Sequence, residues 1–153
     1  MAHLQWTNDL NTNITIIDDQ HKRIVYFINA LEDAKAGGDT SNLGDILKDL
    51  ADYTISHLDF EESLLEKVNY VSIKPHQRIH QLFRDRIAKY IDRYKSGDHE
   101  NVARELHRML SNWLFDHIRT EDDKYVKAVG ADMNEVIRNE ASWVSNSVNK
   151  FFK

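Results

Sequence analysis

Apolar residues recur along the chain at steps of three and four rather than in alternation, which is the period of helices that bury one face. Residues that break helices are few, with five glycines and a single proline in 153 residues. The pattern therefore predicts an all-α protein. Its four long helices are expected over about Asp18–Ala36, about Ser41–Lys67, from near Ser72 to Tyr94, and from near Asp98 to His117. The pair Gly37-Gly38 is expected to end the first helix.

Helices of this length joined by short loops favour an up-down-up-down four-helix bundle within one domain. We expect an extended N-terminal arm over residues 1–17, the bundle over 18–128 and a C-terminal extension over 131–153. Apolar positions in the extension also recur at three- and four-residue steps, which predicts one further amphipathic helix. Two interpretations of that helix stay open. Either it covers apolar surface of the bundle, or it docks a second copy or a partner protein through Trp143, Phe151 and Phe152.

The composition limits which chemistry the chain can perform. With 41% hydrophobic and 29% charged residues, it can bury a sizeable core. It has no cysteine, so any metal must be held by nitrogen and oxygen ligands. A formal charge of −5 without a run of Lys or Arg argues against nucleic acid or anionic lipid as a partner. No apolar run approaches the roughly 20 residues that span a bilayer, and the N-terminus does not resemble a signal peptide, so we expect a cytoplasmic protein that is not integral to a membrane.

The predicted inward faces of the helices carry polar side chains where leucine is expected. Five of the eight histidines and one glutamate fall on these faces: His21, His57, Glu61, His76, His80 and His117. His57 and Glu61 lie one helical turn apart on a shared face, and so do His76 and His80. A lone buried histidine is usually a core residue satisfied by one hydrogen bond, but five of them with a buried carboxylate favour a metal site.

A second buried carboxylate is sought in the stretch 116-DHIRTEDDKY-125. Asp122 lies five residues after His117, which is about 140° away from it in an ideal helix. A local widening of the helix, or its end near this point, would be required to bring Asp122 to the same face. Glu62 points about 100° away from Glu61, so we expect Glu62→Ala to have little effect. The remaining histidines, His3, His99 and His107, are expected at the surface.

Taken together, these motifs resemble the hemerythrin family in its bacterial form. The resemblance covers roughly residues 4–128 and rests on Trp6, Asp18-Asp19-Gln20-His21, His57-x-x-x-Glu61, His76-x-x-x-His80 and Trp113-Leu114-x-x-His117-x-x-x-x-Asp122. It implies a non-haem di-iron centre. In such a centre His76, His80 and His117 hold one iron, His21 and His57 hold the other, and Glu61 and Asp122 bridge both. The family pattern, and not helical geometry, selects Asp122.

The resemblance also implies what the centre binds. Five imidazoles, two bridging carboxylates and one shared oxygen fill about eleven of the twelve positions around two irons, which leaves one on the two-histidine iron for dioxygen. Apolar walls would be formed by Ile24, Leu58, Trp113, Leu114 and Ile118. No Glu is followed by His at the three-residue spacing of carboxylate-rich di-iron oxidases. The expected function is a non-enzymatic carrier for oxygen storage, transport or delivery to an oxygen-consuming enzyme. The alternative is an oxygen- or redox-sensing module that signals through a partner protein.

Overall fold

The computed structural model describes residues 3–37 and 42–152. Gly38 and Ser41, where the sequence places two helix boundaries, lie outside the described residues, as does the last residue of the C-terminal extension. All regular structure in the described residues is helical, which confirms the predicted all-α class. None of their helices combines the length and apolar character that a membrane span needs.

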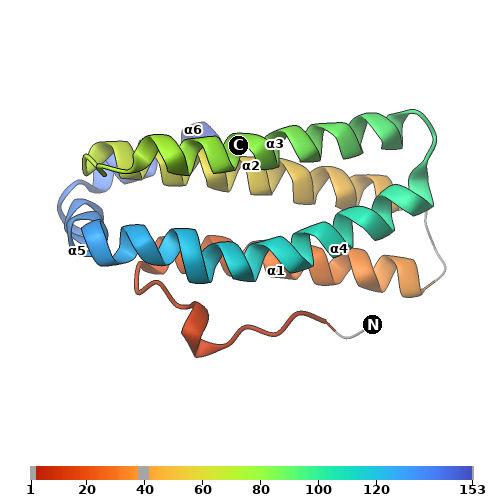
Figure 1. The fold of residues 1–153 in the computed structure, drawn as a ribbon, viewed down its shortest axis with the longest axis horizontal. Helices are drawn as coiled ribbons and strands as arrows, with labels where there is room; N and C mark the ends of the chain where they lie inside the picture. Colours follow the sequence, from red (N-terminus) through yellow and green to blue (C-terminus); the bar gives the residue numbers. More distant parts are fainter. Residues whose placement is uncertain (1–2, 38–41, 153) are drawn as a thin grey trace.

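Four long helices form an up-down-up-down bundle: α1 (Thr15–Ala36), α2 (Leu43–Lys67), α3 (Ile73–Lys95) and α4 (His99–His117). Each helix packs against the next, and α4 closes the bundle against α1 (Figure 1). The first helix begins at Thr15, three residues before the predicted start at Asp18. The reason is that Asp18 lies within the first turn and accepts hydrogen bonds from the backbone N–H and the hydroxyl of Thr12, both at 2.8 Å. The carboxylate therefore ties the N-terminal arm to the helix.

The N-terminal arm runs beside the bundle and contains a short 3-10 turn, η1 (Asn8–Leu10) (Figure 1). Its start is fixed by two bonds between the Leu4 backbone and the Asn29 side chain, at 2.8 and 3.1 Å. Trp6 of the arm lies 6.4 Å from the ring of His21, measured between ring centres. The arm thus covers one of the predicted metal ligands.

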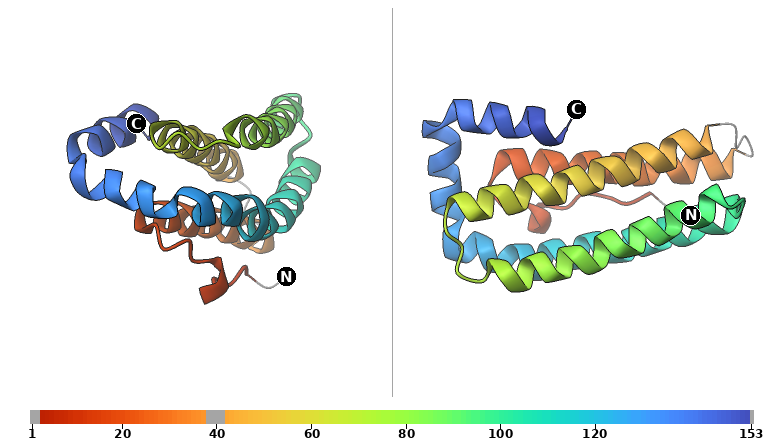
Figure 2. Two further views of the ribbon diagram at one scale, coloured as in Figure 1. Left: turned by 60° about the vertical axis from the view of Figure 1, so that its left-hand side comes forward. Right: turned by 90° about the horizontal axis from the view of Figure 1, so that it is seen from above.

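The helix that contains α4 continues beyond His117 through a π-helical segment, η2 (Ile118–Asp122), into α5 (Asp123–Asn139). Helix α5 crosses the end of the bundle, and α6 (Ala141–Phe151) returns beside α2 (Figure 2). The C-terminal extension is therefore helical as predicted, but it is divided. The chain breaks at Glu140, whose φ of −125° and ψ of 55° are not helical.

The extension covers apolar surface of the bundle. The ring of Phe152 lies 5.1 Å from that of Tyr53 and 6.1 Å from that of Phe60, and Trp143 and Phe151 are partly buried in the same apolar cluster. These contacts favour the covering interpretation, because the three aromatic side chains expected to anchor a partner are packed against their own chain.

Two apolar clusters flank the predicted metal ligands. One runs along the bundle and the other lies at the end that α5 and α6 cover. On α1, His21 falls between Ile17 of the second cluster and Ile24 of the first. The fold therefore places the polar side chains between two dry layers.

Candidate metal centre

The seven predicted ligands all lie inside the bundle, none of them more than 5% exposed: His21, His57, Glu61, His76, His80, His117 and Asp122. Two sets among them have ligand atoms within 4.8 Å of one another, as needed to hold a metal ion. One set contains Glu61 with the three histidines of α3 and α4, and the other contains Glu61 with the histidines of α1 and α2. The helical stripes thus bring together the side chains that the sequence singled out, and Glu61 belongs to both sets.

The carboxylate of Glu61 is divided between the two sets. Its Oε1 lies 2.8 Å from His76 Nε2 and 3.3 Å from His80 Nε2. Its Oε2 lies 3.4 Å from His57 Nε2. One oxygen therefore faces each group of imidazoles, which is the arrangement that a carboxylate bridging two cations requires.

The carboxylate of Asp122 also has one oxygen facing each group of histidines. Its Oδ1 lies 3.3 Å from His117 Nε2, and its Oδ2 lies 3.3 Å from His21 Nε2. Among the described residues, neither of these oxygens has a partner in hydrogen-bond geometry, and nor does either ring nitrogen of His21. Leaving buried polar atoms unpaired costs about 1–3 kcal/mol each. A cation between these groups would supply the missing partner, so the residues fit a bound metal.

The π-helical segment explains how Asp122 reaches the site. The backbone N–H of Asp123 donates to the carbonyl of Ile118, five residues earlier, whereas an α-helix has a four-residue step. The wider turn moves Asp122 onto the face of His117. Of the two possibilities left open by the sequence, widening is therefore the one that occurs, and the helix does not end there.

Two of the predicted ligand histidines contact a side chain of a neighbouring helix: His57 contacts one on α1, and His80 contacts one on α2. The Nδ1 of His57 lies 2.7 Å from the amide oxygen of Gln20, and the Nδ1 of His80 lies 2.8 Å from Glu62 Oε2. Because each of these oxygens accepts a hydrogen bond from Nδ1–H, each ring presents Nε2 to the centre. Glu62 belongs to neither set of clustered ligand atoms, but its contact with His80 argues against the expectation that Glu62→Ala has little effect. The turn of about 100° from Glu61 points Glu62 toward α3, which carries His80.

The five apolar residues expected to wall an oxygen pocket divide into two groups. Ile24, Leu58 and Leu114 are at most 1% exposed and Ile118 is 3% exposed, all within the cluster that runs along the bundle. Trp113 is only partly buried, and its ring stacks on that of His117 with centres 4.3 Å apart. It therefore contacts the group with three histidines.

Both carboxylates of the cluster are held in their charged form. Burial raises the pKa of Glu61, but hydrogen bonds from three of the histidines outweigh burial and lower that pKa well below its usual range. For Asp122, burial and the neighbouring Glu61 raise the pKa, while His117 and His21 bring it down to about 2. Two buried carboxylates held in their charged form make this a site suited to a positively charged ion.

A family model described as the hemerythrin HHE cation binding domain matches residues 12–129. The chain belongs to the hemerythrin family. Its similarity to the bacteriohemerythrin of Pseudomonas aeruginosa reaches 46% identity over 154 residues, covering 99% of each chain. The bacteriohemerythrin of Methylococcus capsulatus is 32% identical over 86% of this chain and 100% of its own. A solved structure of wild-type hemerythrin, 29% identical, superimposes with a TM-score of 0.73 over 82% of this chain and 97% of its own.

One histidine of this hemerythrin-family chain departs from its predicted place. His107 was expected at the surface, but it is only 4% exposed, and its Nε2 lies 3.5 Å from Glu32 Oε2. The inward face of α4 is wider than one stripe because α1 and α3 both pack against it. His107 precedes His117 by about 15 Å of helix, so it does not join the ligands. His3 and His99 are exposed, as predicted.

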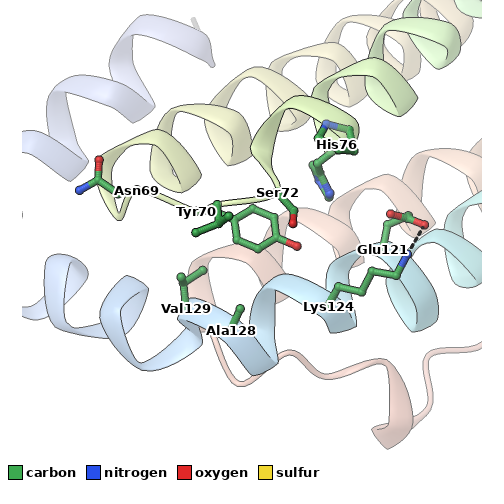
Figure 3. Close-up of a pocket in the computed structure, with 10 residues that line it drawn as sticks. Asn69, Tyr70, Ser72, His76, Glu121, Lys124, Ala128 and Val129 are labelled. Atoms are coloured by element: carbon green, nitrogen blue, oxygen red, sulfur yellow. Dashed lines mark hydrogen bonds and ion pairs between the residues drawn. The ribbon is translucent and has the colours of Figure 1, made fainter.

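A cavity of about 510 Å³ opens between the α2–α3 turn and α5. Figure 3 shows His76 beside Ser72 and Tyr70, with the Glu121–Lys124 ion pair across from them. His76 is thus both a buried candidate ligand and a lining residue of this surface cavity.

Proposed function

We propose that this chain binds dioxygen reversibly at a non-haem di-iron centre. The proposed ligands are His76, His80 and His117 for one iron and His21 and His57 for the other, with Glu61 and Asp122 as bridges. The observation that carries the proposal is the division of each carboxylate between the two groups of histidines. Because the two oxygens of each carboxylate face different groups of histidines, the arrangement suits two cations better than one.

Membership of the hemerythrin family supports iron as the metal and dioxygen as the ligand. Iron held by imidazoles and carboxylates would supply electrons that dioxygen takes up on binding and returns on release. Apolar residues of the chain limit which molecules reach the proposed metal position. Ile24, Leu58 and Leu114 form a dry wall beside the ligands, which excludes water and protons and so slows irreversible oxidation.

We further propose that the chain is a carrier for oxygen storage, transport or delivery, and not an oxidase. The ligand set supports this role, because it has five imidazoles and two carboxylates, whereas di-iron oxidases of similar bundles use carboxylate-rich sites. A carrier returns its oxygen unchanged. A sensor differs from a carrier in requiring a partner protein whose activity follows the oxygenation state.

The test is reconstitution of the metal-free protein with ferrous iron in the absence of oxygen, followed by cycles of air and argon. We expect two irons per chain and a visible charge-transfer band that appears in air and disappears under argon. His57→Ala should abolish the band, whereas His99→Ala, which changes an exposed histidine, should leave it intact. Retention of zinc in preference to iron would overturn the metal assignment, and continuous oxygen consumption with added reductant would overturn the carrier role.

A further inference from the structure

His80 lies between two consecutive glutamates of α2. Its Nε2 is 3.3 Å from Oε1 of Glu61, the proposed bridging ligand, and its Nδ1 is 2.8 Å from Oε2 of Glu62. The His80 side chain is fully buried, and that of Glu62 is 15% exposed. The ring is therefore held at both nitrogens, with one nitrogen toward the proposed metal position and the other away from it.

Glu62 is itself held by an arginine. The Nη2 of Arg84 donates to the same Glu62 oxygen that accepts from His80, and also to Asp59 Oδ1 at 2.7 Å. Arg84 lies one turn after His80 on α3, and Asp59 lies one turn before Glu62 on α2. The guanidinium keeps Glu62 ionised and limits its movement, because the Arg84 side chain is only 17% exposed.

The equivalent partner in the other group of histidines carries no charge. His57 Nδ1 is 2.7 Å from the amide oxygen of Gln20, a residue that is 5% exposed. A carboxylate that accepts from Nδ1 draws the proton toward itself and increases the electron density on Nε2, whereas an amide does so only weakly. The two groups therefore offer imidazoles of different donor strength.

We propose that Glu62, braced by Arg84, is a positioning residue of the metal centre that fixes the His80 ring and makes its Nε2 a stronger donor than that of His57. The inference deepens the proposed function, on which it rests for the presence of two metal positions. It predicts two unequal positions. The one beside His80 holds a divalent ion more tightly, and iron there favours its oxidised state.

The test compares Glu62→Ala and Glu62→Gln with wild type. Alanine removes the bond to His80, and glutamine keeps an acceptor oxygen but removes the charge. The matched control is Glu66→Gln, which removes an equal charge one turn further along α2 at an exposed side chain that bonds only Gln77 among the described residues. The first probe is Co²⁺, titrated into metal-free protein, because its binding and spectrum report ligand geometry without oxygen chemistry.

We expect Glu62→Ala to weaken the tighter Co²⁺ site roughly 10–100-fold and Glu62→Gln to weaken it less, with no change in Glu66→Gln. In the iron-loaded protein, both Glu62 variants should shift the reduction midpoint to higher potential, because the oxidised state loses the stronger donor. Since the glutamine variant preserves shape and hydrogen bonding, it decides the question if the alanine variant fails to fold.

Two results would overturn the proposal. One is Co²⁺ affinity and potential in Glu62→Gln and Glu62→Ala that match those of Glu66→Gln. The other is a lower melting temperature with both properties unchanged, which would mean that Glu62 only ties α2 to α3. Failure of the proposed oxygen function would appear in wild type, as the absence of an oxygen-dependent band, and the Co²⁺ comparison would still decide the role of Glu62. If wild type binds no Co²⁺, both proposals fall.

Discussion

The hydroxyl of Tyr125 donates to Oε2 of Glu61 over 3.0 Å, although the two residues are 64 positions apart and lie on different helices. Tyr125 belongs to α5, outside the four-helix bundle, and is completely buried. Its ring lies 5.5 Å from that of His76. The start of α5 is therefore part of the candidate metal centre, and the bundle alone does not complete it.

Tyr125→Phe tests this relationship, because it keeps the ring and removes the donor. Glu61 then loses one of its hydrogen-bond partners while its contacts with the histidines remain. We expect the free energy of unfolding of the metal-free protein to fall by about 1–2 kcal/mol, measured by urea denaturation. Iron should still bind at two per chain. If iron binding is lost as well, Tyr125 is needed to hold Glu61 in place and is more than an additional donor.

The sequence predicts the site wherever ligands share one helical face. The pairs His57/Glu61 and His76/His80 follow from spacing alone, because residues one turn apart point the same way. Asp122 does not follow from spacing, because its position depends on a π-helical segment that an ideal helix lacks.

Glu121, Asp122 and Asp123 are three consecutive acidic residues that follow His117. The structure separates them, because Glu121 pairs with Lys124 and Asp123 with Lys127 at the surface, while Asp122 is fully buried among histidines. We expect Asp122→Ala to reduce bound iron below two per chain, and Glu121→Ala and Asp123→Ala to retain it, as measured by metal analysis of purified protein. The reverse order would mean that the π-helical register is misassigned.

The hydrophobic period of the sequence does not predict which side chains of different helices contact one another at the site. Gln20 and Glu62 each stand next to a predicted ligand in the sequence, yet their roles depend on which helix passes beside them. Glu62 contacts His80 because α3 packs against α2. The long side chain of Arg84 donates a hydrogen bond to the same Glu62 oxygen. The break at Glu140 is equally non-local, since α6 turns there to lie on α2.

Deletion of residues 140–153 tests whether α6 covers the bundle. It leaves α5 and Tyr125 intact but uncovers Tyr53 and Phe60, which contact Phe152. We expect a loss of roughly 2–4 kcal/mol, which lowers the melting temperature by roughly 5–10 °C. Iron content and the association state, measured by light scattering, should not change. A loss of association with little change in melting would instead support the docking interpretation of the extension.

His107 makes the stability of the fold depend on pH, and it lies about 15 Å along α4 from the predicted ligand His117. Burial lowers the pKa of His107, nearby Lys35 lowers it further, and Glu32 opposes them. The folded protein therefore binds this proton less readily than the unfolded chain, whose histidine titrates at about 6.5. Stability from the neutral ring is fully present above that pH and decreases as the pH falls from about 6.5 toward the lowered folded value.

His107→Gln should remove this dependence, because glutamine does not titrate. We expect the melting temperature of iron-loaded wild type to fall more steeply between pH 7.5 and about 5.5 than that of His107→Gln, while ligand histidines bound to iron stay unprotonated in both. His99→Gln, at an exposed histidine, is the control and should follow wild type. Parallel melting curves for wild type and His107→Gln across this range would show that protonation of His107 is not linked to unfolding.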